Sequence, residues 1–310
     1  MILPYYPTGI HPPEKASLNT FFFHEDRFVM RYGKDPHIYT LSTRKSGDLR
    51  ARMFISISGN EAVSMSKSSF GGIDFAPFAD ESDAADMVEV LFNFLVENKI
   101  TKCRIHAFPQ CYDSYSHDLM ESALIERGFE VAWTDITHYY QPAGQPFDTV
   151  IDPDERTHLN FARKSNWQFR KLDKDYLPAA FDLITRSREA KGYPETLSLE
   201  ELTRNFNHFP DIFHLFGVFD GPDLRSTSVC IRVNDNILYD ISHGDNPEKR
   251  KHNSMLPLIQ GLYYYARQHR YSLLDLGIST EKGVKNEGLF NFKRKLGSAV
   301  SEKKTFVWEF

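Results

Sequence analysis

The chain has 310 residues, of which 41% are hydrophobic and 25% are charged, and its net charge at pH 7 is −5. This composition is typical of a globular protein of about two domains, and the negative charge argues against general nucleic-acid binding. The longest apolar runs, such as Val88–Val96, are too short to span a bilayer, and residues 1–15 lack the apolar segment of a secretory signal.

The cysteines and the short motifs exclude several other classes of protein. Cys103, Cys111 and Cys230 follow no metal-binding spacing and cannot all pair within one chain. Reduced thiols are typical of the cytoplasm. The sequence contains no P-loop, no nucleophile elbow, no His-Glu-x-x-His and no dinucleotide-binding glycine motif. We therefore expect a cytoplasmic protein with no metal site.

The first half of the chain predicts a meander, a helix, a strand, a second helix and a last strand. Three strands separated by turn residues are expected at 37–43, 51–58 and 62–68. Ala84–Val96 places its apolar residues on one helical face, with Ser82 or Asp83 as the N-cap. The remaining elements are a strand at Cys103–Phe108, a helix at Asp118–Arg127 ended by Gly128, and a strand at Glu130–His138.

The second half begins after a Pro-, Gly- and Asp-rich stretch, Gln141–Asp154, which is expected to be the linker. Three helices are predicted next, at Asp154–Lys171, Leu177–Ala190 and Leu199–Phe206. A second meander is expected at 212–219, 227–233 and 237–242. It is followed by a helix with its apolar stripe from Met255 to Ala266, a strand at Leu273–Ile278, a helix at Leu289–Leu296 ended by Gly297, and a strand at Lys304–Phe310.

The two halves repeat the same order of elements at nearly constant spacing. Ala85 and Met255 are 170 positions apart, Lys102 and Ser272 are 170 apart, and Gly128 and Gly297 are 169 apart. A fixed spacing of several landmarks in the same order indicates a duplicated unit. The sequence therefore predicts an α/β (α+β) protein with two domains, 1–145 and 146–310, each a mixed, mostly antiparallel twisted sheet flanked by helices.

The last quarter of the chain carries a resemblance to a known family. Asp275-Leu-Gly-Ile and Gly288-Leu-Phe-Asn-Phe-Lys-Arg-Lys-Leu-Gly297 are similar to two signatures of the Fem-type (FemABX-like) aminoacyltransferases, and Leu238-Tyr-Asp-Ile-Ser-His-Gly244 is similar to a third. These proteins contain two GNAT N-acyltransferase units in one chain. The helical arm of the Fem-type enzymes has no counterpart here, because no heptad stretch is present.

The resemblance implies an acyltransferase whose donor and catalytic site lies in the second half, with a degenerate donor site in the first. The expected activity is transfer of an acyl group from an acyl-CoA, as co-substrate rather than permanent cofactor, to a small-molecule amine. Two alternatives stay open. One is transfer of an aminoacyl group from a charged tRNA to a peptidoglycan precursor, and the other is a catalytically inactive GNAT-like binding module.

The two halves differ in charge where a GNAT unit binds the donor pyrophosphate. Such a site needs backbone N–H groups at a helix start and positive charge. The first half has acidic residues there: Asp80, Glu81, Asp83 and Asp86. The second half has basic and capping residues, which are the candidate donor-binding residues: Lys249, Arg250, Lys251, Asn253 and Ser254. Asn253 and Met255 stand where the family pattern has glycine or alanine.

The catalytic candidates follow from the chemistry of acyl transfer, which needs an uncharged amine and stabilisation of an oxyanion. By resemblance, Phe292 and Lys293 are expected at the reacting ester, although a core phenylalanine and a solvated lysine would fit the same helix pattern. Tyr239 is a candidate proton donor and His243 a candidate base. Asp275 and Ser279 are expected to bind or orient substrate, and Asp275 must be paired if it is buried.

Overall fold

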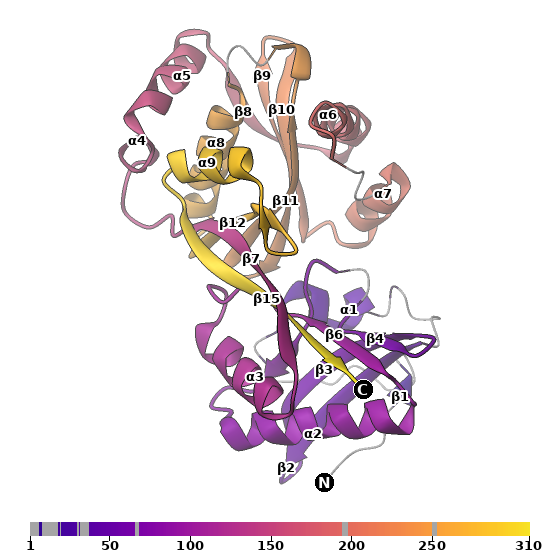
Figure 1. Ribbon diagram of the computed structural model, residues 1–310. Helices are drawn as coiled ribbons and strands as arrows, with labels where there is room; N and C mark the ends of the chain where they lie inside the picture. Colours follow the sequence, from indigo (N-terminus) through magenta and orange to yellow (C-terminus); the bar gives the residue numbers. More distant parts are fainter. Residues whose placement is uncertain are drawn as a thin grey trace. The chain divides into compact units, whose positions relative to one another are not determined.

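The structure is a computed structural model that describes residues 6–7, 18, 20–29, 31, 37–65, 68–193, 198–249 and 253–310. The chain forms two compact units (Figure 1). Unit 1 contains Met1–Ile136, Thr280–Val284 and Ser301–Phe310, and unit 2 contains Thr137–Ser279 and Lys285–Val300. The strands β7 (Glu130–Tyr140) and β15 (Ala299–Glu309) each contribute residues to both units. The end of the chain, predicted in the second domain, thus belongs to unit 1 from Ser301 onward.

Unit 1 is a sheet with the strand order β1-β2-β3-β4-β6-β15. Its strands are β1 (Tyr6–Pro7), β2 (Ile38–Lys45), β3 (Asp48–Ser58), β4 (Glu61–Val63), β5 (Ile73–Phe75) and β6 (Lys102–His106). Strands β2, β3 and β4 form the predicted antiparallel meander, and β4 then pairs with β6 in parallel. The helices are α1 (Asp26–Val29), α2 (Glu81–Glu97) and α3 (Ser114–Glu126), with a 3-10 turn at Phe22–His24.

Helix α2 begins one turn before the predicted start. Its N-cap is Asp80, not Ser82 or Asp83, and Asp80 and Asp83 form a capping box in which each carboxylate accepts from the other residue's backbone N–H. The Asp83 carboxylate is fully buried and also accepts from Arg50 (2.6 Å) and Lys45 (2.8 Å). These partners hold the pKa of Asp83 well below its usual range, although burial alone would raise it. The helix start in unit 1 is therefore closed by its own side chains.

Unit 2 repeats this order of elements, which confirms the predicted fold class. Its sheet has the order β7-β12-β11-β10-β9-β8. The strands are β8 (Gln168–Leu172), β9 (Phe213–Asp220), β10 (Asp223–Asn234), β11 (Ile237–Asp245) and β12 (Leu273–Ile278). The helices are α4 (Phe147–Val150), α5 (Pro153–Lys164), α6 (Leu177–Glu189), α7 (Leu199–His208), α8 (Met255–Gln268) and α9 (Glu287–Lys295), with 3-10 turns at Lys174–Tyr176 and Pro247–Lys249. A short hairpin, β13 (Thr280–Glu281) and β14 (Val284–Lys285), precedes α9.

Two predictions for the start of the second half are wrong. The helix predicted at Asp154–Lys171 ends at Lys164, because Asn166 adopts a left-handed backbone (φ 54°), and the chain continues as β8, antiparallel to β9. The stretch predicted as a linker, Gln141–Asp154, contains α4, and its Phe147 is fully buried in the core of unit 2. Apolar residues spaced among prolines and glycines packed here instead of connecting two domains loosely.

The two predicted helix-ending glycines are confirmed. Gly128 follows α3 with φ 94°, and Gly297 follows α9 with φ 75°. Both values lie in the left-handed region that favours glycine at a helix C-terminus. At Gly297 a Cβ would lie 2.0 Å from the Val150 carbonyl oxygen, so no larger residue fits. Among the described residues, no helix is both long enough and apolar enough to cross a bilayer.

Candidate functional site

The parallel strands β11 and β12 of unit 2 pair at one end and then diverge. Their paired residues are Ile237 with Leu273, Leu238 with Leu274, and Tyr239 with Asp275. Past these pairs, 240–243 of β11 and 276–278 of β12 line a cavity of about 580 Å³. A register shift against β10 leaves Ile241 as an extra residue in β11, and such bulges re-aim neighbouring side chains. We call this divergence of the two strands the fork of unit 2.

The cavity at the fork is also lined by α6, by the start of α8 and by α9. Its volume lies within the range of small-molecule sites, roughly 300–1,000 Å³. Of the predicted catalytic residues, all four line it: Tyr239, His243, Phe292 and Lys293. The fold thus brings together residues that are more than 50 positions apart in the sequence.

Lys293 spans the fork. Its side chain is buried, at 3% exposure, and its Nζ donates to the carbonyl oxygens of Leu276 (2.7 Å), Gly277 (2.9 Å) and Ile278 (2.9 Å). These carbonyls belong to the part of β12 that has moved away from β11. An ammonium has three donors, so this set uses all of them. Burial lowers the pKa of Lys293 to about 8, against the opposing charges of Asp275 and Asp240.

Asp275 holds the turn that aims these carbonyls. Its carboxylate is buried and accepts from Thr137 Oγ1 (2.8 Å) and from the backbone N–H of Gly277 (2.6 Å). Gly277 has φ 76°, a left-handed conformation that favours glycine. Asp275 does not line the cavity. The Asp-Leu-Gly-Ile signature is explained by this geometry, in which one carboxylate fixes a left-handed turn beside Lys293.

His243 is oriented by an aspartate that the sequence analysis missed. Its Nδ1 lies 2.7 Å from Asp240 Oδ2, and Asp240 Oδ1 accepts from Ser228 Oγ at 2.7 Å. The Asp240 side chain is fully buried, whereas His243 is 22% exposed. With Nδ1 held by Asp240, the other ring nitrogen, Nε2, can exchange a proton with a substrate. Three residues between an aspartate and a histidine on one strand were the available signal.

Phe292 and Tyr239 form part of the wall of the cavity. Phe292 is half-buried and packs against the core of unit 2. The Tyr239 ring lies beside Gly277, and its hydroxyl would be 3.9 Å from a Cβ there. Both the packing role and the substrate-facing role weighed for Phe292 are therefore open to the same side chain.

The predicted donor residues are spread over different environments. Asn253 lines the cavity, and its Oδ1 accepts from the backbone N–H of Met255, the first residue of α8 (3.2 Å). Ser254 is buried and donates to the Arg225 carbonyl (3.1 Å). Lys249 pairs with Asp223 at 2.6 Å outside the cavity. Arg250 and Lys251 lie outside the described residues.

Ser279 lies behind the fork. It is buried, and its Oγ lies 2.8 Å from His138 Nε2, while His138 Nδ1 lies 2.9 Å from Ser298 Oγ. Burial, with the nearby charge of Lys293, lowers the pKa of His138 to about 4. Ser279 and this neutral histidine therefore link β12 to the segment that follows α9.

Other polar residues of the cavity were not predicted. Arg188, Lys191 and Tyr193 reach it from α6 and the turn that follows, and Asp245 from the end of β11. Asp245 accepts from Ser187 Oγ (2.7 Å) and from Lys191 (3.4 Å). Tyr193 accepts from the Asn286 side chain (2.6 Å) at the start of α9. No short motif connects α6 with the family signatures, so only the fold shows their role in the wall.

Comparisons with known proteins support the fold but not a family. No protein-family model matches the sequence, and no curated protein matches it. Among solved structures, FemX matches with a TM-score of 0.70 at 11% identity, covering 93% of this chain and 92% of that chain. A conserved protein of unknown function from Bacteroides thetaiotaomicron matches at 0.59 and 12% identity, covering 88% and 86%. L-PGS from Bacillus licheniformis matches at 0.57 and 10% identity, covering 86% and 83%. The predicted FemABX-like tandem GNAT fold is thereby confirmed.

Proposed function

We propose that this chain is an N-acyltransferase that moves an acyl group from an acyl-CoA to an amine in the cavity of unit 2. The observation that carries the proposal is the Asp240–His243 pair beside the buried Lys293 at an open fork of the sheet. A base, a buried cation and an enclosed cavity are the elements that amide formation requires.

The base in this proposal is His243. An amine attacks a carbonyl only when it is uncharged, so a proton must leave the acceptor before or during attack. His243 Nε2 takes this proton, and Asp240 holds the ring and stabilises the imidazolium that forms. The orienting pair resembles in its logic other catalytic histidines held by a carboxylate.

Lys293 and Tyr239 act on the other side of the reaction. Because three carbonyls already accept from Lys293 Nζ, its contribution to the oxyanion is that of a positive charge in a buried setting, without a direct hydrogen bond. The Tyr239 hydroxyl donates a proton to the thiolate of CoA as it leaves. The attacking nitrogen forms the new bond to carbon, and the carbon–sulfur bond breaks.

The start of α8 would receive the donor phosphates, and Asn253 controls access to it. The Met255 N–H, which a phosphate would use, already donates to Asn253 Oδ1. Calorimetric titration of the wild type with acetyl-CoA and longer acyl-CoAs tests the proposal. We expect binding, and tighter binding by Asn253→Gly, which frees this N–H. Absence of binding by every acyl-CoA tested in both proteins would refute acyl-CoA as donor.

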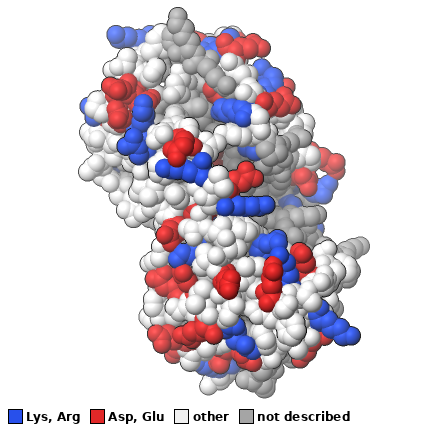
Figure 2. Space-filling model, viewed as in Figure 1, with Lys and Arg blue, Asp and Glu red and all other residues white. Residues whose placement is uncertain are grey.

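A charged tRNA is the second candidate donor, and the occupied N–H of Met255 favours it, since an aminoacyl ester needs no pyrophosphate site at α8. On the face drawn in Figure 2, basic and acidic side chains of the described residues are interspersed rather than gathered by sign. Transfer from charged tRNA to a peptidoglycan precursor would distinguish this candidate. Equal amounts of product from wild type and Lys293→Ala, at the level of a no-enzyme blank, would remove it.

A binding module without catalysis is the third candidate, and the same Asn253 contact supports it. It predicts ligand binding that survives His243→Gln with no turnover by either protein. The cytoplasmic location expected from the thiols stays a prediction, which cell fractionation would test.

A further inference from the structure

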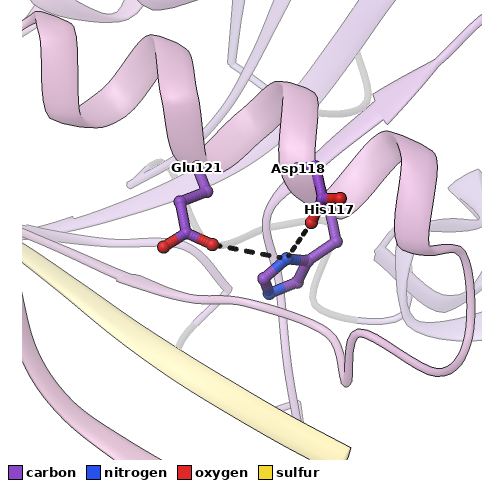
Figure 3. A group of neighbouring side chains, drawn as sticks. All are labelled: His117, Asp118 and Glu121. Atoms are coloured by element: carbon purple, nitrogen blue, oxygen red, sulfur yellow. Dashed lines mark ion pairs between the residues drawn. The ribbon is translucent and has the colours of Figure 1, made fainter.

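A histidine and two carboxylates converge on one side of α3 in unit 1, far in sequence from the fork. His117 and Glu121 are four positions apart, which places them on the same helical face, and Asp118 is adjacent. Figure 3 shows the carboxylates of Asp118 and Glu121 turned toward the His117 ring. His117 Nδ1 lies 3.6 Å from Asp118 Oδ1 and 3.7 Å from Glu121 Oε2.

His117 has an unusual environment for a buried polar side chain. It is fully buried, and neither ring nitrogen has a hydrogen-bond partner among the described residues. Buried polar atoms are nearly always paired, and an unpaired one often marks a bound water or ion. Burial lowers the pKa of His117, which keeps the imidazole in the neutral form that binds metals. Its Nδ1 is directed at two carboxylates rather than at a donor.

We propose that His117, Asp118 and Glu121 bind a divalent cation, with Zn²⁺ as the best-matched ion. One ligand atom from each residue lies within 4.8 Å of the others. Ligands about 2.0–2.2 Å from a tetrahedral Zn²⁺ are roughly 3.3–3.6 Å apart, close to the two distances from His117 Nδ1. One nitrogen and two oxygens suit zinc, and a water completes the shell. The sequence analysis expected no metal because these spacings match no short zinc motif.

The neighbours of the trio both support and oppose the ion. Gln110 Nε2 donates to Asp118 Oδ1 at 2.9 Å and so orients that ligand. Lys304 Nζ donates to both oxygens of Glu121, at 2.7 and 2.9 Å, and lies 3.1 Å from Glu302. The lysine therefore competes with a cation for Glu121, and Glu302 can retain it when the cation binds. Removal of Lys304 should strengthen the site.

Titration calorimetry with ZnCl₂ on the full chain tests this assignment. We expect one Zn²⁺ per chain in the wild type and at least tenfold weaker binding by Glu121→Gln, which removes one of three ligands. Lys304→Gln should bind more tightly than the wild type. Glu126→Gln is the matched control, because Glu126 is exposed on the same helix, and its affinity should equal that of the wild type.

A second measurement places the ion without depending on these variants. Histidine nitrogen resonances in NMR should show a large shift of His117 Nδ1 on addition of one equivalent of Zn²⁺. Equal Zn²⁺ affinity of Glu121→Gln and the wild type, no binding by Lys304→Gln, or an unchanged His117 resonance would each overturn the proposal.

Discussion

Units 1 and 2 contain the same fork, and only its contents differ. In unit 1, β4 and β6 pair in parallel at three positions, from Glu61 with Lys102 to Val63 with Arg104. In unit 2, β11 and β12 pair at three positions, and then β11 continues for six more residues. Strand β4 ends at its third paired residue. The longer strand supplies Asp240, His243 and Asp245 to the cavity.

The chain itself occupies the fork of unit 1. Ser64 N donates to the Arg104 carbonyl (2.9 Å), and Gly71 N donates to the His106 carbonyl (2.7 Å). Ser64 Oγ accepts from His106 N, and Phe70 beside it is buried. In unit 2 the carbonyl two residues past the last pair, that of Gly277, accepts from Lys293 instead. A backbone fills one fork, and a side chain with a cavity fills the other.

The comparison teaches that duplication preserves a topology while leaving its polar groups to be satisfied in different ways. Buried carbonyls need donors in either unit. Backbone donors close the space, whereas one lysine satisfies three carbonyls from a single point and leaves room beside it. We infer that this difference separates a structural unit from the unit that carries the chemistry.

The largest expected effect comes from removing the base of unit 2. His243→Gln should lower turnover by about 10²- to 10⁴-fold, the usual contribution of general base catalysis. The matched control is His106→Gln in the fork of unit 1, which should change turnover less than about twofold. Turnover is measured as release of CoA thiol with a panel of amines. Equal losses in the two variants would contradict the assignment of chemistry to unit 2.

Next in size is the stability of the fork without its lysine. Lys293→Met should lower the free energy of unfolding by about 3–5 kcal/mol, because three buried carbonyls and the Asp275 carboxylate lose their cation. Lys295→Met on the same helix is the control, since Lys295 is 46% exposed and its partner Glu155 is 4.0 Å away, and we expect little change. Urea unfolding measures both. Similar values for the two variants would show that Lys293 does not hold the fork.

The pH dependence of stability should sharpen the same point. Burial lowers the pKa of Lys293 from 10.5 to about 8, so between these values the unfolded chain binds a proton that the folded chain has lost. The free energy of unfolding should therefore rise from pH 8 to 10.5 by up to about 3 kcal/mol from this group. Lys293→Met should lack this rise. An identical pH profile in wild type and variant would show that Lys293 titrates normally.

A smaller effect is expected in unit 1. Gly71→Ala places a Cβ 2.6 Å from the Ser64 carbonyl oxygen, so the segment in the fork must shift, at a cost of about 1–3 kcal/mol. Gly288→Ala in the cavity of unit 2 meets nothing closer than 3.7 Å and should stay within about 0.5 kcal/mol. Thermal unfolding of both variants checks the difference. A tolerated Gly71→Ala would mean that the fork of unit 1 is open.

Periodicity and spacing were sufficient to predict the duplicated topology, because apolar alternation and the helix-ending glycines Gly128 and Gly297 are local signals. The family signatures also located Lys293. Asp240 could not be found in this way, because its role depends on a bulge at Ile241 and on the divergence of two strands. Residues of α6 such as Arg188 reach the cavity only through tertiary packing. The strand at Gln168–Leu172 was missed because helix-like charge patterning masked the break at Asn166.

Amide hydrogen exchange with and without a bound acyl-CoA tests the central claim most directly, since it reports on both forks at once. The account predicts slower exchange in 240–245 and 276–279 of unit 2, with 68–75 and 104–107 of unit 1 unchanged. Slower exchange confined to the segments of unit 1 would contradict it.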